Sequence, residues 1–92
     1  MKEKKLIVLG GTSASLDVVR IAKKMGIYTI VIDDQEDGVA KKIADEARLI
    51  STTDIDAIVE LAKTTKADGI FCGPSEFNIR NMLNASTRAG LP

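Results

Sequence analysis

Residues 4–28, KKLIVLGGTSASLDVVRIAKKMGIY, decide the fold of this chain. An aliphatic run, Lys5 to Leu9, leads into two glycines and a loop of small residues, and apolar residues then recur at helical spacing. A strand, a glycine turn and a helix in this order form the first part of a βαβ unit, in which a helix joins two parallel strands. The stretch therefore predicts an α/β fold, and it raises the question of whether the glycine loop binds a ligand.

Three further apolar runs follow, at residues 27–32, 47–51 and 69–72, and helical patterns separate them. Their apolar residues are continuous rather than alternating, which is typical of strands covered on both faces. Connections between parallel strands are right-handed, which leaves few topologies to consider. We expect about four parallel strands in the spatial order 3-2-1-4, with helices on both faces of the sheet.

The expected helices are marked by apolar stripes and by end signals. Gly26 stands where a left-handed helix end belongs, Thr53 or Asp54 is the expected N-cap of the next long helix, and Gly90 and Pro92 end the last one. A shorter helix is expected around residues 39–44. The stripes expected to face the core are Ala14, Val18, Ile21, Ala22 and Met25; Ile55, Ile58, Val59 and Ala62; and Met82, Leu83 and Ser86.

Composition limits the classes of protein to be considered. Ninety-two residues suit one small domain, and 13 basic residues balance 13 acidic ones, so neither nucleic acid nor an anionic membrane is expected as a partner. With one Cys and no His, the chain can form no internal disulfide, and we expect no zinc site. The lone cysteine fits a reducing, cytoplasmic compartment. No apolar run approaches the length needed to span a membrane.

The predicted ligand-binding edge lies beyond the carboxyl ends of the strands, where the strand order reverses between the first and fourth strands. Residues 10–15 supply backbone N–H groups and hydroxyls at a helix N-terminus, which favours an anion. The loop has neither the G-x-G-x-x-G pattern of dinucleotide-binding folds nor a P-loop sequence. The candidate substrate-binding residues are Gly10, Gly11, Thr12, Ser13, Ala14, Asp33, Ser75 and Glu76.

Each candidate also has a purely structural interpretation. The glycine pair could only make a tight turn, Asp33 could cap local N–H groups instead of holding a ribose hydroxyl, and Ser75 could serve as a helix N-cap. Glu76 falls in a first helical turn, where the helix dipole alone favours an acid. No nucleophile paired with a base and no acidic cluster at metal spacing is evident, so we predict neither catalytic residues nor a metal site.

Three further side chains and the cysteine complete the survey of the last strand and helix. Cys72 is expected to be a small buried apolar residue. Asn78, Arg80 and Asn81 could face solvent or a partner domain, and the sequence does not choose between these positions.

The order and spacing of five short segments resemble the N-terminal pre-ATP-grasp domain of ATP-grasp ligases, a family that includes biotin carboxylase and the large subunit of carbamoyl phosphate synthase. The similarity covers essentially the whole chain and implies a three-layer, Rossmann-like domain. The segments are KKLIVLGGTSAS (4–15), MGIYTIVIDD (25–34), VAKKIADEARLIS (39–51), TTDIDAIVELAKTTKADGIFCGPSEF (52–77) and AGLP (89–92).

The resemblance implies that the parent enzyme joins a carboxylate or bicarbonate to an amine, with ATP and Mg²⁺ activating the carboxylate as an acyl phosphate. ATP and metal would be held mainly by following domains, so no cofactor is expected in this chain. The pre-ATP-grasp domain would contribute to the acceptor-substrate site through residues 10–14 and Glu76. We thus expect residues 1–92 to form a single domain cut before an ATP-grasp domain of the same polypeptide, and inactive alone.

One departure from the family leaves the substrate open. Ligases of the purine pathway tend to have Gly-x-Gly followed by Glu or Gln in the first loop, where this chain has Thr12 and Ser13. The GPSEFN segment (73–78) is closer to carbamoyl-phosphate-synthase-like ligases. A free-standing nucleotide- or NAD-binding module and a non-catalytic interaction domain remain alternatives, and a homodimer is not excluded.

Overall fold

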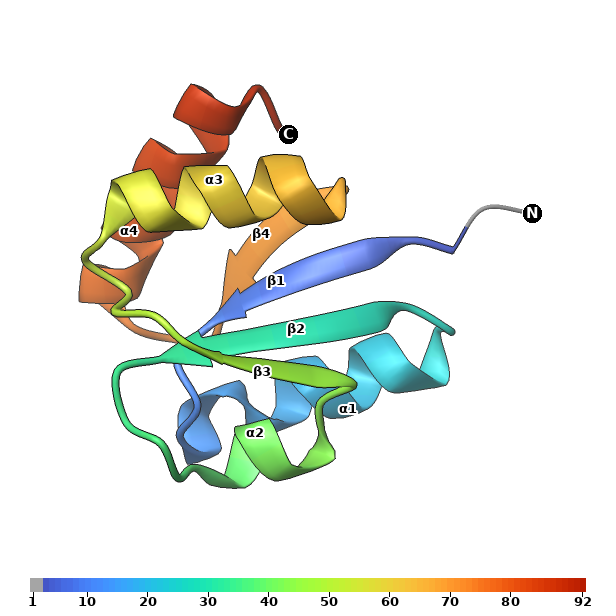
Figure 1. The fold of residues 1–92 in the computed structure, drawn as a ribbon. Coiled ribbons are helices and arrows are strands. Elements are labelled where there is room, and N and C mark those ends of the chain that lie inside the picture. The colour runs from blue at the N-terminus through green and yellow to red at the C-terminus, as the bar shows by residue number, and fades with distance from the viewer. Residues whose placement is uncertain (1–2) are drawn as a thin grey trace.

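The computed structural model describes residues 3–92, which form one four-stranded parallel sheet between two layers of helices (Figure 1). The strands are β1 (Lys5–Leu9), β2 (Tyr28–Asp33), β3 (Glu46–Leu49) and β4 (Gly69–Cys72), in the order β3-β2-β1-β4. All three pairings are parallel. The predicted strand order is therefore confirmed. The bounds of the first and fourth strands are also as expected, and the other two begin one residue later or earlier.

The helices lie in pairs on opposite faces of the sheet. A short 3-10 turn, η1 (Ser13–Ser15), leads into α1 (Leu16–Lys24), and α2 (Val39–Ile43) lies beside α1 on one face (Figure 1). The other face carries α3 (Ile55–Thr65) and α4 (Glu76–Ala89), which pack against each other (Figure 1). This arrangement confirms the expected three-layer α/β fold.

Two apolar clusters, one on each face, hold the layers together, because successive residues of a strand point to opposite faces. Burying one large aliphatic side chain contributes about 1.5–3 kcal/mol to stability, so the larger cluster supplies most of the stabilisation. That cluster lies under α3 and α4 and contains Ile7, Leu9, Ile30, Ile32, Ile58, Leu61, Ala62, Ala67, Ile70, Cys72 and Ala85. The smaller one lies under α1 and α2 and contains Val8, Val19, Val31 and Ala40.

The helix ends agree with the sequence signals in all but one case. Asp54 is the N-cap of α3, and its Oδ1 accepts a hydrogen bond from the backbone N–H of Ala57 at 3.2 Å. Gly26 and Gly90 have positive φ after α1 and α4, as expected for left-handed helix ends. The exception is Lys66, which ends α3 at φ 58° without a glycine.

The predicted core face of α1 is wrong. Its buried residues are Val19 and Ala22, with Ser15 just before the helix, whereas Ile21 and Met25 are 58% and 68% exposed. The 3-10 turn sets this rotation, because the hydroxyl of buried Ser15 donates to the carbonyl of Leu9 at 3.3 Å. Helix periodicity identifies an apolar stripe, but it does not decide which flank of the stripe meets the sheet.

The predicted face of α4 is partly wrong for a related reason. Ala85 and Ser86 are buried and Met82 is partly buried against the larger cluster, but Leu83 is 58% exposed. The stripe of α3 is correct, since Ile58, Val59 and Ala62 are buried. Among residues 3–92, no helix combines the length and the apolar character that crossing a membrane requires.

Candidate functional site

The candidate site lies at the carboxyl edge of the sheet, where the loops after β1, β2 and β4 meet. The first loop turns sharply after β1: Gly10 has φ 98°, a conformation that favours glycine, and its N–H donates to the carbonyl of Ile32 at 2.8 Å. A side chain at Gly10 would also meet the amide of Asn78 and the hydroxyl of Ser15. The glycine is thus required by the backbone and by its surroundings.

Asp33 ties the end of β2 to this loop. Its Oδ2 accepts a hydrogen bond from the N–H of Gly11 at 2.6 Å, and its Oδ1 accepts one from the N–H of Gln35 at 2.9 Å. Partial burial raises the pKa of Asp33, but these two N–H donors outweigh it, so the pKa of the carboxyl lies below its ordinary value. Both carboxylate oxygens are therefore used in holding the protein's own backbone.

The segment after β2 closes against the first loop from the other side. Ala40 donates its N–H to the carbonyl of Gly11 at 3.0 Å, and a Cβ at Gly38 would collide with that same carbonyl. Lys41 turns back over the segment, and its ammonium donates to the backbone carbonyls of Asp33, at 3.2 Å, and Gln35. These contacts fix the position of the loop through its base.

Three N–H groups of the first loop are bonded within the protein, and its tip faces solvent. The N–H groups of Gly10 and Gly11 are used as described, and that of Ser15 donates to the carbonyl of Thr12 at 3.0 Å. Thr12, Ser13 and Ala14 are exposed. A ligand approaching this loop would therefore meet the tip, with its two hydroxyls, rather than the glycine pair.

The loop after β4 packs directly on the tip of the first loop. A Cβ at Gly73 would collide with the carbonyl of Ala14, so the two backbones touch where only glycine fits. Ser75 is the N-cap of α4 and accepts a hydrogen bond from the N–H of Asn78 at 3.3 Å, which confirms its predicted capping role. Glu76 follows in the first turn of α4 and is exposed.

Asn78 is a site residue that the sequence analysis did not place. Its amide lies against Gly10, and its buried Oδ1 has no hydrogen-bond partner among the described residues. The Nδ2 of Asn81, one turn later, is buried and unpartnered in the same sense. The signal in the sequence was the position of Asn78, three residues after the N-cap, which points its side chain back toward the loops.

The remaining candidates have structural surroundings. Cys72 is buried, its sulfur lies 3.9 Å from that of Met82, and burial raises the pKa of its thiol, all of which agrees with a packing role. Arg80 is exposed on α4. Between residues 3 and 92, no three His, Cys, Asp or Glu side chains gather closely enough to hold a metal ion.

Comparison with known proteins places this geometry in a family. No family model matches the chain. A formate-dependent phosphoribosylglycinamide formyltransferase from Synechococcus sp. (strain WH7803) is 31% identical over 62 residues, which cover 67% of this chain and 16% of that protein. The crystal structure of N5-carboxyaminoimidazole ribonucleotide synthetase from Thermotoga maritima matches 92% of the chain at 26% identity, with a TM-score of 0.74. The chain matches the pre-ATP-grasp domain of ATP-grasp ligases.

Two further structures agree with the match to the pre-ATP-grasp domain. Phosphoribosylglycinamide synthetase from Anaerococcus prevotii shares the fold over 99% of the chain, with a TM-score of 0.84 and 22% identity. N5-carboxyaminoimidazole synthetase from Staphylococcus aureus, solved with ADP, matches 78% of the chain at 26% identity, with a TM-score of 0.67. The chain spans only 16% of the curated relative and 19–23% of these three structures, so the relatives are several times longer.

Proposed function

We propose that this pre-ATP-grasp domain forms the acceptor-substrate side of an ATP-dependent carboxylate–amine ligase. The observation that carries the proposal is the contact between the loops after β1 and β4. Gly73 packs on the carbonyl of Ala14, which brings the segment bearing Glu76 to the loop that exposes Thr12 and Ser13. An exposed carboxylate and hydroxyls on one rim suit a small polar acceptor carrying an amine.

The proposed division of labour leaves the phosphate chemistry to other parts of the polypeptide. In a ligase of this type a carboxylate oxygen attacks the γ-phosphorus of ATP, ADP leaves, and the amine then displaces phosphate from the acyl phosphate. No group within residues 3–92 has the ligand set for Mg²⁺, so we assign ATP and metal to a following ATP-grasp domain. The role of this chain is then to bind and orient the acceptor amine.

The finer assignment is to a carbamoyl-phosphate-synthase-like ligase acting in the cytoplasm. It is supported by GPSEFN (73–78) and by Thr12 and Ser13, where ligases of the purine pathway tend to have other residues. A panel of bicarbonate and small carboxylates, each offered to the natural full-length protein with ATP, tests it. ADP release that requires bicarbonate supports this assignment, and release that requires a purine-pathway ribonucleotide contradicts it.

Substitution of Glu76 tests the acceptor role itself. In the natural full-length enzyme we expect Glu76→Gln to raise the KM for the best acceptor in a panel of ammonia, amines and amino acids by about tenfold. This is the loss of one charge-assisted hydrogen bond. The KM for ATP should stay within about twofold, because the nucleotide is held elsewhere.

Glu60→Gln is the matched control, since Glu60 is an exposed acid on α3. It should leave both KM values unchanged. Equal acceptor KM values in the Glu76→Gln variant and the parent, with the fold intact, would contradict the proposal and favour a non-catalytic interaction domain.

A free-standing NAD-binding module is less well supported. In a dinucleotide-binding fold an acid at the end of the second strand holds a ribose hydroxyl, but the carboxylate of Asp33 accepts from Gly11 and Gln35 instead. NAD-dependent shifts of the backbone amides of residues 10–15 in an NMR titration would restore this alternative.

A further inference from the structure

The outer edge of β4 is open along its whole length. Within residues 3–92, β4 pairs with β1 alone, so half of its backbone N–H and C=O groups point away from the sheet. Parallel sheets are normally covered on both faces, and an exposed apolar edge is a ready template for another strand. The sequence of β4, GIFC, contains no charged residue that would discourage such pairing.

Exposed apolar side chains line both faces of the sheet at this edge. Phe71, whose side chain lies on the α1 side, is 49% exposed because α1 packs over β1 and β2 rather than β4. A hollow of about 230 Å³ separates Phe71 from α1, and a second of about 400 Å³ continues from Phe71 to α4. We call this the β4-edge surface; its residues are Val18, Ile21, Met25, Phe71, Ile79 and Leu83.

The β4-edge surface is continuous rather than a set of scattered residues. Val18 and Phe71 line both hollows, and Ile79 lines the second as well as a shallower one that reaches Leu83. Single exposed apolar residues need no explanation, but a contiguous apolar strip along an unpaired strand indicates an interaction surface.

The handedness of the fold indicates where a further strand would be added. The connection from β3 through α3 to β4 carries the chain across the sheet, and α4 lies on the same face as α3 (Figure 1). A right-handed crossover that uses α4 must therefore continue in the same direction, to the side of β4 away from β1. Because α4 runs back to the amino ends of the strands, a segment following it would start beside the beginning of β4.

We infer that polypeptide following residue 92 adds a fifth parallel strand to the free edge of β4 and covers the β4-edge surface. The inference rests on the proposed function in one respect, that the chain is the first part of a longer ligase. The matched proteins are several times longer than this chain, which supplies the length required. The occupant is thus a segment of the same polypeptide, and the contact fixes this domain to the rest of the enzyme.

Amide hydrogen exchange tests the inference without any assay of activity. The natural full-length protein is compared with the 92-residue chain, which has its own two-sided core and is expected to fold alone. We expect peptides containing residues 69–73 to exchange at least about tenfold more slowly in the full-length protein, because the outward N–H groups gain partners. Peptides containing β3 should exchange equally in both.

A pair of substitutions at the two sheet edges provides the matched control. Phe71→Asp should restore fast exchange of residues 69–73 in the full-length protein, whereas Leu49→Asp, at an exposed apolar position on β3, should change nothing there. Each variant is first checked in the 92-residue chain, where neither side chain is buried and both should leave the fold intact.

Three results would overturn the inference. Equal exchange of residues 69–73 in the two proteins would mean that nothing covers the edge. Protection that grows with the concentration of the 92-residue chain would assign the surface to a second copy. A reading frame that stops after codon 92 would remove the occupant. Slow exchange in a full-length protein without ligase activity would leave the inference standing and count against the proposed function alone.

Discussion

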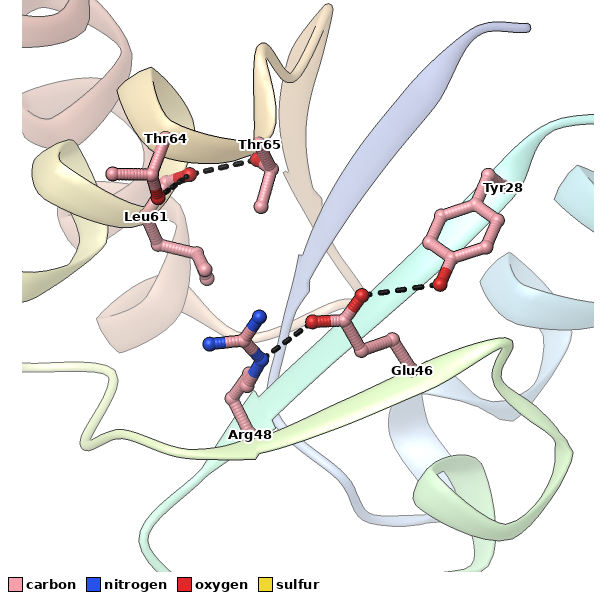
Figure 2. A network of polar contacts seen from close by, with 6 residues as sticks. All are labelled: Tyr28, Glu46, Arg48, Leu61, Thr64 and Thr65. Carbon is pink, nitrogen blue, oxygen red and sulfur yellow. Dashed lines mark hydrogen bonds and ion pairs between the residues drawn. The ribbon is translucent and has the colours of Figure 1, made fainter.

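The two outer strands of the sheet, β3 and β4, have the same length but opposite surface chemistry. Each contains four residues and each has one free edge within the described part of the chain. On β3, Glu46 and Arg48 form an ion pair, and Tyr28 of the neighbouring strand donates its hydroxyl to Glu46 at 3.1 Å (Figure 2). On β4 the corresponding side chains are apolar, and Phe71 stands half exposed.

The difference teaches which edge faces water and which awaits protein. Charged side chains at an edge discourage another strand from pairing there, because pairing would strip them of solvent. The end of α3 is also satisfied locally, since the hydroxyls of Thr64 and Thr65 donate to the carbonyl of Leu61 at 3.2 and 2.7 Å (Figure 2). The β3 edge is a finished surface, whereas the β4-edge surface has the composition of an interior.

The largest effect is expected at the carboxyl end of β4. Gly73→Ala should destabilise the chain by about 2–3 kcal/mol, because the new Cβ collides with the backbone carbonyl of Ala14 and neither loop can move freely. Urea unfolding followed by circular dichroism measures the change.

Gly69→Ala, at the start of the same strand, is the control for this substitution. Its Cβ would lie 3.5 Å from the side chain of Leu6, an ordinary contact, so the change should stay below about 1 kcal/mol. Equal losses from the two substitutions would show that the contact between the loops does not hold the end of β4.

An intermediate effect is expected at the centre of the sheet, where Asp33 ends β2. Because the pKa of Asp33 is lowered in the folded state, its carboxylate stabilises the fold above the unfolded pKa, and this contribution is lost as the pH falls through the folded value. Asp33→Asn should cost about 1 kcal/mol at pH 7, a modest figure because the group is largely exposed to solvent.

Unfolding free energies of the parent and the Asp33→Asn variant between pH 7 and pH 2 check this prediction. The two curves should converge as the pH drops below the ordinary aspartate range. Asp37→Asn, at an exposed position in the same loop, should follow the parent throughout. A constant gap between parent and Asp33→Asn at all pH values would mean that ionisation of Asp33 is not what holds Gly11.

The smallest effect is expected at the β3 edge and is spectroscopic. The hydrogen bond to Glu46, with some desolvation, raises the pKa of Tyr28, the chain's single tyrosine. This bond contributes stability below the ordinary tyrosine pKa, and the contribution is lost as the pH rises through the folded value. Glu46→Gln should lower the pKa of Tyr28 toward its ordinary value, read as tyrosinate absorbance.

Glu60→Gln, on α3, should leave that tyrosine titration unchanged. An unchanged pKa in the Glu46→Gln variant would break the contrast between the two edges, since the network in Figure 2 would then not operate in solution.

Much of the fold could be predicted because its signals are local. The apolar runs, the glycines after α1 and α4 and the N-cap Asp54 each act within a few residues, and right-handed crossovers then fix the strand order. The errors concern rotation about helix axes. The stripe containing Ile21 and Met25 is real, but Ser15 and Val19 meet the sheet instead.

The candidate site could be predicted as a set of segments but not as a set of contacts. Topology alone brings residues 10–14, 33 and 75–76 to one edge of the sheet. Which atoms they offer depends on partners distant in sequence: Asp33 turns toward Gly11, 22 residues earlier, and Asn78 lies against Gly10. The ligand-binding roles of these residues remain predictions for the experiments above.

The sequence by itself determined the elements, their order and the edge at which the loops meet, because hydrophobic periodicity, caps and chain handedness are short-range properties. Tertiary structure decided which side of α1 is buried, where the carboxylate of Asp33 points, and that Phe71 of β4 stays exposed while β3 carries an ion pair. These outcomes depend on how elements dock against one another, and docking is set by close packing between residues that are far apart in the chain.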